Sequence, residues 1–178
     1  MDKDSKIIFS TPISLEKDVK QKGKKEVKTE KDYKRIAEAT LKAANDIEDI
    51  IIVYFKNNPR KFMASEGVSA YMFFAIELYI KSILYKQKKS LIEIRKKHDL
   101  LALFELIDIK TRGEIEKLCY GYAPYKNYVD FYFELKHIKD GFEILRYHYE
   151  YTGMCYNYSF TLGLLSAVKN IANREIKT

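Results

Sequence analysis

Apolar positions recur at three- and four-residue steps along most of this chain, which is the period of an α-helix. The first such pattern begins near Asp32 and is ended by Asn57-Asn58-Pro59, because the residue before a proline avoids the helical region and proline has no amide to donate. Its apolar stripe consists of Ile36, Ala39, Thr40, Ala43, Ile47, Ile50 and Tyr54.

A second predicted helix runs from about Ser65 to Lys86 and is apolar almost all round. Its large apolar residues are Val68, Tyr71, Met72, Phe73, Phe74, Ile76, Leu78, Tyr79, Ile80, Ile83 and Leu84. A helix without a polar face must be covered on every side, so we expect it at the centre of the fold.

The second half of the chain continues the helical period. Asp99 precedes a run of leucines and is a candidate N-cap, because its carboxylate can accept from free amides of the first turn. Further helices are predicted over 112–119, with Gly121 and Pro124 breaking the pattern, over 131–149 despite Gly141, and over 158–172. With no βαβ unit or internal repeat, the prediction is an all-α, up-and-down helical bundle of about five or six helices.

Charge divides the chain into an arm and a body. Residues 1–30 alternate in charge without a steady apolar period and are predicted to be a flexible basic N-terminal arm, whereas residues 31–178 form the bundle. The net charge of +7 is concentrated in two places: residues 1–35 hold 11 basic and 7 acidic side chains, and residues 86–98 hold six and one. Such patches attract phosphates, although a solvated arm and a solubilising loop are the favoured explanation of charge runs taken alone.

Cysteine usage and hydropathy exclude several classes of protein. Cys119 and Cys155 do not form a CxxC pair, so we expect no metal site, no cofactor and two reduced thiols. No apolar run was expected to reach the ~20 residues of a membrane span, and Met1–Asp4 is too mixed in charge for a secretory signal. The prediction is a soluble, cytoplasmic protein without a membrane partner.

Three segments carry a resemblance to a known superfamily. They are Ala75-Ile76-Glu77-Leu78-Tyr79-Ile80-Lys81-Ser82-Ile83-Leu84, Lys97-His98-Asp99-Leu100-Leu101-Ala102-Leu103-Phe104 and Phe142-Glu143-Ile144-Leu145-Arg146-Tyr147-His148-Tyr149-Glu150. In order and spacing they are similar to prokaryotic HEPN-like (higher-eukaryote-and-prokaryote nucleotide-binding) proteins, over roughly residues 33–172. The resemblance implies a helical bundle, a homodimer and a role in toxin–antitoxin or antiphage defence, often as an RNA-cleaving enzyme.

This chain departs from the usual ribonuclease motif of that superfamily, an Arg followed after four to six residues by a His. Two residues separate Arg95 from His98, and one separates Arg146 from His148. The departure favours an alternative in which the bundle is a non-catalytic dimerisation and interaction module. For the homodimer, the Tyr-rich segment 147–158 is the expected self-complementary surface.

The polar residues of these segments each have a structural and a chemical interpretation. Glu77 and Lys81 share one helix face, where Glu77 pairs with Lys81 or Arg146, or acts as an acid or base. His98 either packs at a helix start beside Asp99 or transfers protons. If the chain is extended after residue 145, Arg146, His148 and Glu150 point one way, so that Arg146 holds a phosphate and His148 moves a proton.

The sequence thus leads to one leading hypothesis and one rival. In the first, the chain contacts RNA or a nucleotide through the loop 86–98, with metal-independent endoribonuclease activity as a further step. Its candidate proton-transfer and phosphate-holding residues are His148, His98 and Arg146, and its candidate nucleic-acid-binding residues are Lys88, Lys89, Arg95, Lys96 and Lys97. In the rival hypothesis, the arm binds a cognate protein partner instead.

Overall fold

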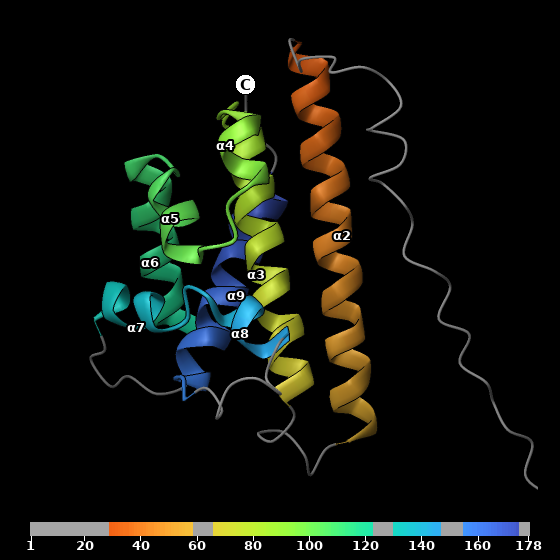
Figure 1. Ribbon diagram of the computed structural model, residues 1–178, viewed down its shortest axis with the longest axis vertical. Helices are drawn as coiled ribbons and strands as arrows, with labels where there is room; N and C mark the ends of the chain where they lie inside the picture. Colours follow the sequence, from red (N-terminus) through yellow and green to blue (C-terminus); the bar gives the residue numbers. More distant parts are fainter. Residues whose placement is uncertain (1–28, 59–65, 123–129, 147–154, 175–178) are drawn as a thin grey trace, which may run out of the picture.

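The computed structural model describes residues 29–58, 66–122, 130–146 and 155–174, and within these ranges every regular element is an α-helix (Figure 1). The elements are α2 (Glu30–Asn57), α3 (Glu66–Lys86), α4 (Leu91–Arg95), α5 (Leu100–Glu105), α6 (Ile109–Tyr122), α7 (Phe131–His137), α8 (Gly141–Arg146) and α9 (Tyr158–Asn173). The predicted all-α helical bundle is confirmed. Its long members are α2, α3, α6 and α9, and the described residues add four helices of only one or two turns. The predicted flexible arm lies outside the described residues, except for Thr29 and Glu30.

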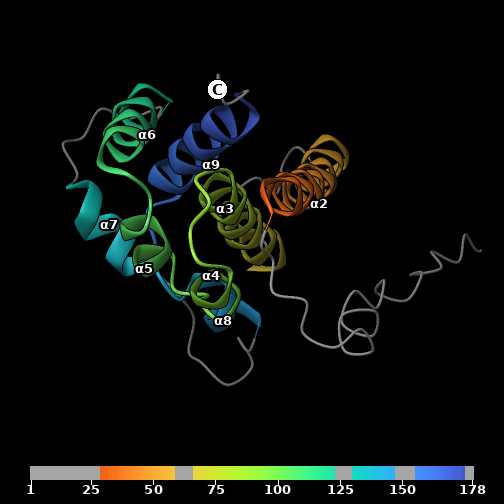
Figure 2. The same cartoon turned by 90° about the horizontal axis from the view of Figure 1, so that it is seen from above.

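Helix α3 lies at the centre of the bundle, as its apolar pattern predicted. In Figure 2, α2 flanks it on one side and α9 on another, while α4, α5 and α8 lie around the rest. Its large side chains are almost fully buried, among them Met72, Phe73, Ile76, Tyr79, Ile80 and Leu84. Each such side chain contributes about 1.5–3 kcal/mol by leaving water, so α3 supplies much of the core.

Helix α2 begins and ends close to the predicted positions. The Thr29 hydroxyl accepts from the Asp32 amide at 3.2 Å, so the helix starts at Glu30. Against α3 it fully buries only Ala37, Ala44 and Ile51. Two of these are alanines, so the two backbones approach closely along one narrow stripe.

Polar contacts fix α2 to the rest of the bundle. The Tyr79 hydroxyl lies 2.6 Å from Glu48 Oε2 and 2.8 Å from Asn45 Oδ1. Burial, with the Glu48 carboxylate second, raises the pKa of Tyr79, so this hydroxyl remains a donor. Lys169 of α9 reaches the same Glu48 oxygen at 2.9 Å, and one carboxylate therefore joins three helices.

The single helix predicted over 131–149 was wrong, because the chain turns between α7 and α8. Asp130 caps α7, whose helix ends at His137, and the Lys139 carbonyl in the turn accepts from the Leu100 amide at 2.8 Å. The break lets α8 lie on α3, where Phe142 stacks on Phe74 with ring centroids 4.6 Å apart. Residues 147–149 lie outside the described part of the chain.

Two further sequence interpretations need revision. Gly121 does not end a helix, because α6 continues to Tyr122. The segment Gly67–Lys86 is long and apolar enough to cross a membrane, which the sequence analysis did not anticipate. In the bundle 72% of that window is buried, as in the core helix of a soluble protein. The cytoplasmic location stays a prediction.

Gly141 should be essential for the packing of α8 against α3. A Cβ atom there would lie 2.8–2.9 Å from the ring of Phe73, which is fully buried, so the ring or the helix would have to shift. We therefore expect Gly141→Ala to lower the free energy of unfolding by about 1–3 kcal/mol in urea denaturation. Gly113→Ala is the matched control: it lies in α6 with nothing within 4 Å of the new methyl group, and helix propensity should raise stability by about 0.5–1 kcal/mol. Equal effects of the two substitutions would contradict this packing.

Candidate functional site

Helix α3 carries a charged pair inside its otherwise apolar surface. Lys81 Nζ donates to Glu77 Oε1 at 2.7 Å, and the two side chains are 9% and 2% exposed. The four-residue spacing places both on one face of α3. The two residues proposed as a structural pair are therefore in contact, and each supplies the counter-charge that burial of the other requires.

His98 joins this pair from a segment distant in sequence. Its Nδ1 lies 3.0 Å from the same Glu77 Oε1, while its side chain is 57% exposed. Glu77 Oε2 is buried and has no hydrogen-bond partner among the described residues. The arrangement is a surface histidine held by a buried carboxylate, which is itself held by a buried lysine.

No spacing rule in the sequence predicts the contact between His98 and Glu77. Helix α3 runs on for nine residues beyond Glu77 to Lys86, and α4 then folds back beside it. Leu91 and Ile94 are buried and anchor α4. This return brings His98 level with Glu77, 21 residues earlier in the chain. In the sequence, His98 and Glu77 have one feature in common: both lie in segments that carry the family resemblance.

Tyr85 and Arg95 extend the site along α3 and α4. Tyr85 continues the α3 face of Glu77 and Lys81 by another four residues and is 5% exposed. Burial raises the pKa of the Tyr85 hydroxyl, the Arg95 charge acts to lower it, and the Glu77 charge raises it further. Because Tyr85 is affected by both charges, Arg95 and Glu77 act on one region of the α3 surface.

The predicted nucleic-acid-binding residues surround α4. Lys88 adopts a left-handed backbone with φ 55°, which ends α3 and turns the chain; its Nζ lies 2.8 Å from Glu30 Oε1. Lys89 and Lys97 are half-buried, whereas Arg95 and Lys96 are exposed. We call Arg95, Lys96 and Lys97 the basic segment; it leads directly into His98.

Asp99 has the structural role that the sequence predicted. Its Oδ1 accepts from the Ala102 amide at 2.8 Å and caps α5, which confirms the predicted N-cap. Its Oδ2 lies 3.6 Å from Lys139 Nζ. Asp140 chiefly, with Asp99, raises the pKa of Lys139. These contacts hold the loop carrying His98 against the turn between α7 and α8.

The other two predicted site residues cannot be placed beside this site. Arg146 is the last residue of α8, and its side chain lies outside the described residues, as does the whole of His148. The alternative pairing of Glu77 with Arg146 and the extended arrangement of residues 146–150 therefore stay predictions. Within the described ranges, no three His, Cys, Asp or Glu side chains group closely enough to hold a metal ion.

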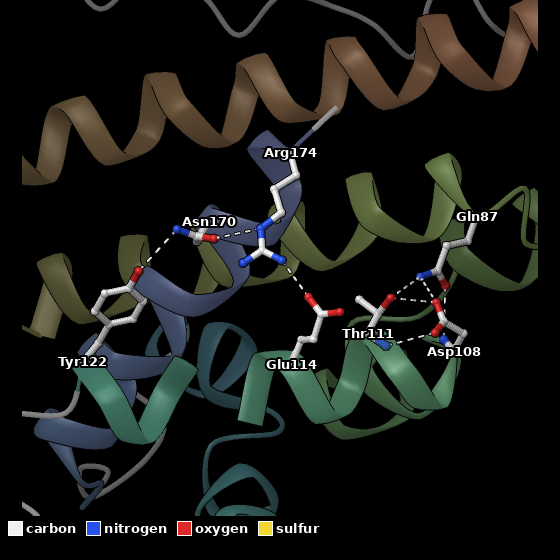
Figure 3. A network of polar contacts seen from close by, with 7 residues as sticks. All are labelled: Gln87, Asp108, Thr111, Glu114, Tyr122, Asn170 and Arg174. Atoms are coloured by element: carbon white, nitrogen blue, oxygen red, sulfur yellow. Dashed lines mark hydrogen bonds and ion pairs between the residues drawn. The ribbon is translucent and has the colours of Figure 1, made fainter. Parts of the chain in front are cut away.

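A second polar cluster lies at the end of the bundle where α3, α6 and α9 meet (Figure 3). There Arg174 donates to Glu114 Oε2 at 2.6 Å and to Asn170 Oδ1 at 3.1 Å, and Asn170 donates to the Tyr122 hydroxyl. The cluster borders a cavity of about 330 Å³ lined by Ile83, Lys86, Gln87, Asp108, Thr111, Glu114, Ile171 and Arg174.

The polar groups of this cluster form hydrogen bonds with one another. Gln87 Nε2 donates to Asp108, whose Oδ1 accepts from the Thr111 amide at 2.9 Å. Burial acts to raise the pKa of Asp108, but hydrogen bonds from Thr111 outweigh it and the pKa is lowered. Lys86 donates to the carbonyls of Ala172 and Arg174 and so caps the end of α9. We interpret the cluster as a set of contacts that hold α3, α6 and α9 together. The candidate site is therefore placed at His98.

Breaking the buried pair should cost far more than breaking an exposed pair of the same geometry. We expect Lys81→Met to lower the free energy of unfolding by up to about 3–5 kcal/mol, because Glu77 keeps a buried charge without its closest counter-charge. The double variant Glu77→Leu/Lys81→Met should recover much of that loss, because neither charge remains.

The control is Lys42→Met, which breaks a 2.7 Å pair with Asp46 whose side chains are 76% and 60% exposed. Urea denaturation should show a loss below about 1 kcal/mol for this pair. Similar losses for Lys42→Met and Lys81→Met would show that burial does not govern the Glu77–Lys81 pair.

Comparison with known proteins finds no matching family model, no matching curated protein and no matching solved structure. The HEPN-like assignment therefore stays a prediction carried by the three sequence segments, and the chemistry of this chain must be argued from its own residues.

Proposed function

We propose that this chain binds RNA through the basic segment and cleaves it by proton transfer at His98, without a metal ion. The observation that supports this most is the contact of His98 Nδ1 with the buried Glu77 carboxylate at 3.0 Å, in a side chain that is 57% exposed. A histidine that is both oriented and open to solvent suits acid–base chemistry near neutral pH.

Electrostatic attraction between basic side chains and phosphates would drive the binding of RNA. Residues 86–98 hold six basic residues and one acidic residue, and Arg95 and Lys96 project from the surface beside His98. An RNA backbone crossing this surface would place its phosphates on Arg95 and Lys96, with the adjacent ribose within reach of the histidine. Such binding releases counter-ions and weakens as salt increases.

The orientation of His98 determines which nitrogen reacts. An ionised carboxylate only accepts hydrogen bonds, so the neutral imidazole carries its proton on Nδ1, facing Glu77, and leaves Nε2 free as a base. Lys81 donates to the same Glu77 oxygen at 2.7 Å, and the Glu77 charge would stabilise the imidazolium that forms. Glu77 and Lys81 are thus positioning residues, and His98 is the proposed catalytic residue.

The proposed reaction is an internal transesterification. His98 Nε2 takes the proton of a ribose 2′-hydroxyl, and the 2′-oxygen bonds to the adjacent phosphorus. The bond from phosphorus to the 5′-oxygen breaks, and that oxygen receives the proton from Nε2. The products are a 2′,3′-cyclic phosphate and a 5′-hydroxyl, with no water or metal consumed. Arg95 would offset the charge that develops on the phosphate oxygens.

The biological setting follows only from the resemblance. HEPN-like proteins of defence and toxin–antitoxin systems often cleave RNA, and we extend that setting to this chain as part of the proposal. The spacing of Arg95 and His98 differs from the usual motif of that superfamily, so this reaction would use a different arrangement of the same two residue types.

A non-catalytic interaction module is the second candidate function. It is favoured by Ile50 and Val53 on α2, which are both more than half exposed. In that case the Glu77–Lys81 pair beside His98 only stabilises the fold, and the chain acts by binding another protein. The two functions make opposite predictions for RNA.

Removing the basic segment should weaken RNA binding in a salt-dependent way. For Arg95→Gln/Lys96→Gln/Lys97→Gln we expect weaker binding to a mixed single-stranded RNA pool, with a salt slope reduced by about 2, since each lost contact removes ~0.7. Fluorescence anisotropy over a series of salt concentrations measures both quantities.

The control removes three exposed lysines from α6 and α7, as Lys110→Gln/Lys117→Gln/Lys136→Gln, and makes the same change in net charge. It should keep most of the binding and of the slope. Equal losses in the two triple variants would indicate attraction by net charge alone, and no binding by the unmodified protein would reject the RNA proposal.

Cleavage should depend on His98. We expect His98→Ala to lower the rate by about 10²–10⁴-fold, the usual contribution of a positioned base, with the helical circular dichroism spectrum unchanged. Glu77→Gln should lower the rate of cleavage by a smaller factor than His98→Ala, because the ring of His98 is then no longer oriented by a carboxylate. Mass spectrometry of the products should show a 2′,3′-cyclic phosphate.

His137→Ala provides the matched control, because His137 lies on α7 with its Nδ1 near the Phe133 carbonyl and is remote in sequence from Glu77. It should cleave at the unmodified rate, and His148→Ala tests the other histidine predicted from the sequence. Cleavage that survives both His98→Ala and His148→Ala would reject these residue roles. A folded protein that cleaves none of several RNAs would favour the interaction module.

A further inference from the structure

Helix α3 carries a third polar side chain on the face of Glu77 and Lys81. Tyr85 follows Lys81 by four residues, so the three side chains form one row along about 12 Å of the helix. Long side chains on a helix lean towards its N-terminus, which directs the Tyr85 ring back over the turn that carries Lys81. The row therefore begins at the carboxylate that contacts His98 and ends at a phenol.

The ring of Tyr85 is buried, whereas its hydroxyl is available to a ligand. Only 5% of the residue is exposed. Among the described residues the hydroxyl has no hydrogen-bond partner, and it is not one of the enclosed polar atoms that lack a partner. An atom that is neither bonded nor enclosed is open to solvent. The core therefore fixes the ring, and the hydroxyl group at its tip can donate to a bound molecule.

The charges of two residues of the candidate site act on this hydroxyl. Burial chiefly raises the pKa of Tyr85, the Arg95 charge acts to lower it, and the Glu77 charge raises it further. Because the net pKa is raised, the hydroxyl keeps its proton near neutral pH. Such effects weaken with distance, so Tyr85 lies close to both the carboxylate that orients His98 and the guanidinium that would meet a phosphate.

We propose that the Tyr85 hydroxyl donates a hydrogen bond to a non-bridging oxygen of the phosphate that is cleaved. This inference rests on the proposed RNA cleavage and adds a second catalytic residue to it, since the hydroxyl would touch the reacting group. Attack by the 2′-oxygen increases the negative charge on the non-bridging oxygens. A donor whose position is already fixed stabilises that charge more than it stabilises the bound RNA.

Tyr85 would complement Arg95 without taking part in proton transfer. Arg95 reaches the phosphate from α4 and Tyr85 reaches it from α3, so two helices would hold one group. The proton of the 2′-hydroxyl still passes through His98 Nε2 to the 5′-oxygen, and Tyr85 keeps its own proton throughout. The role of Tyr85 is therefore electrostatic, and it can be separated from that of His98.

Tyr85→Phe removes this hydroxyl and leaves the ring in the core. We expect kcat for cleavage of a single-stranded RNA to decrease by about 10²–10³-fold, the usual effect of removing one such donor. RNA binding in fluorescence anisotropy should weaken much less, because the full charge develops only during the reaction. The urea midpoint should not change, because the hydroxyl has no partner among the described residues.

Tyr79→Phe is the matched control, because Tyr79 is buried on the same helix but donates within the protein. Its hydroxyl lies 2.6 Å from Glu48 Oε2 and 2.8 Å from Asn45 Oδ1, both on α2. We expect this variant to lower the urea midpoint and to cleave RNA with an unchanged kcat. The two substitutions should thus have opposite effects on stability and on cleavage.

Sulfur substitution tests the contact itself. Synthetic RNAs would carry a single phosphorothioate, in either configuration, at the phosphate that the unmodified protein cleaves. Sulfur is a weak hydrogen-bond acceptor, so the unmodified protein should cleave one configuration more slowly than the all-oxygen RNA. Tyr85→Phe should cleave that configuration and the all-oxygen RNA at the same rate. A purely structural role of Tyr85 would slow the cleavage of all these RNAs alike.

The outcomes separate this inference from the proposed function. An unchanged kcat in Tyr85→Phe, or the same sulfur effects in the variant and the unmodified protein, overturns the role of Tyr85 and leaves RNA cleavage by His98 in place. A folded, unmodified protein that cleaves no RNA rejects the proposed function, and the role of Tyr85 is rejected with it.

Discussion

Burial of most of the α3 surface is the constraint on which the rest of this structure depends. Its apolar side chains point in all directions, so no single neighbouring helix can cover them. Helices α2, α9, α8 and α5 each cover one side, and α4 folds back over what remains (Figure 2). The break between α7 and α8 follows from the same need, because an uninterrupted helix could not lay Phe142 on Phe74.

The candidate site is a consequence of this burial. A carboxylate on a helix without a solvent-facing side is costly unless other groups bind it. Glu77 meets that requirement with Lys81 on its own helix and His98 from the returning chain, both within 3.0 Å. A contact that stabilises a buried charge thus also fixes the ring of an exposed histidine. For this reason the same three residues, Glu77, Lys81 and His98, contribute to stability and carry the proposed chemistry.

Helix α2 shows the opposite situation. It is joined to the core by a narrow inner stripe and by Glu48, which contacts both Tyr79 and Lys169. On the side away from α3 it carries two apolar residues, Ile50 and Val53, that are more than half exposed. The basic segment and these two residues lie on different elements of the bundle.

The sequence by itself determined the all-α class, the central place of α3, the ends of α2 and the cap at Asp99. These features depend on short-range physics: the 3.6-residue period, the restriction before Pro59 and the reach of a side chain to its own first turn. The pair Glu77–Lys81 belongs with them, because four residues along a helix are neighbours in any fold. Only the tertiary structure decided that His98 meets Glu77, that the chain turns between α7 and α8 and that Ile50 and Val53 of α2 stay exposed. Each of these depends on where the chain returns after a turn, and helical periodicity contains no information about that direction.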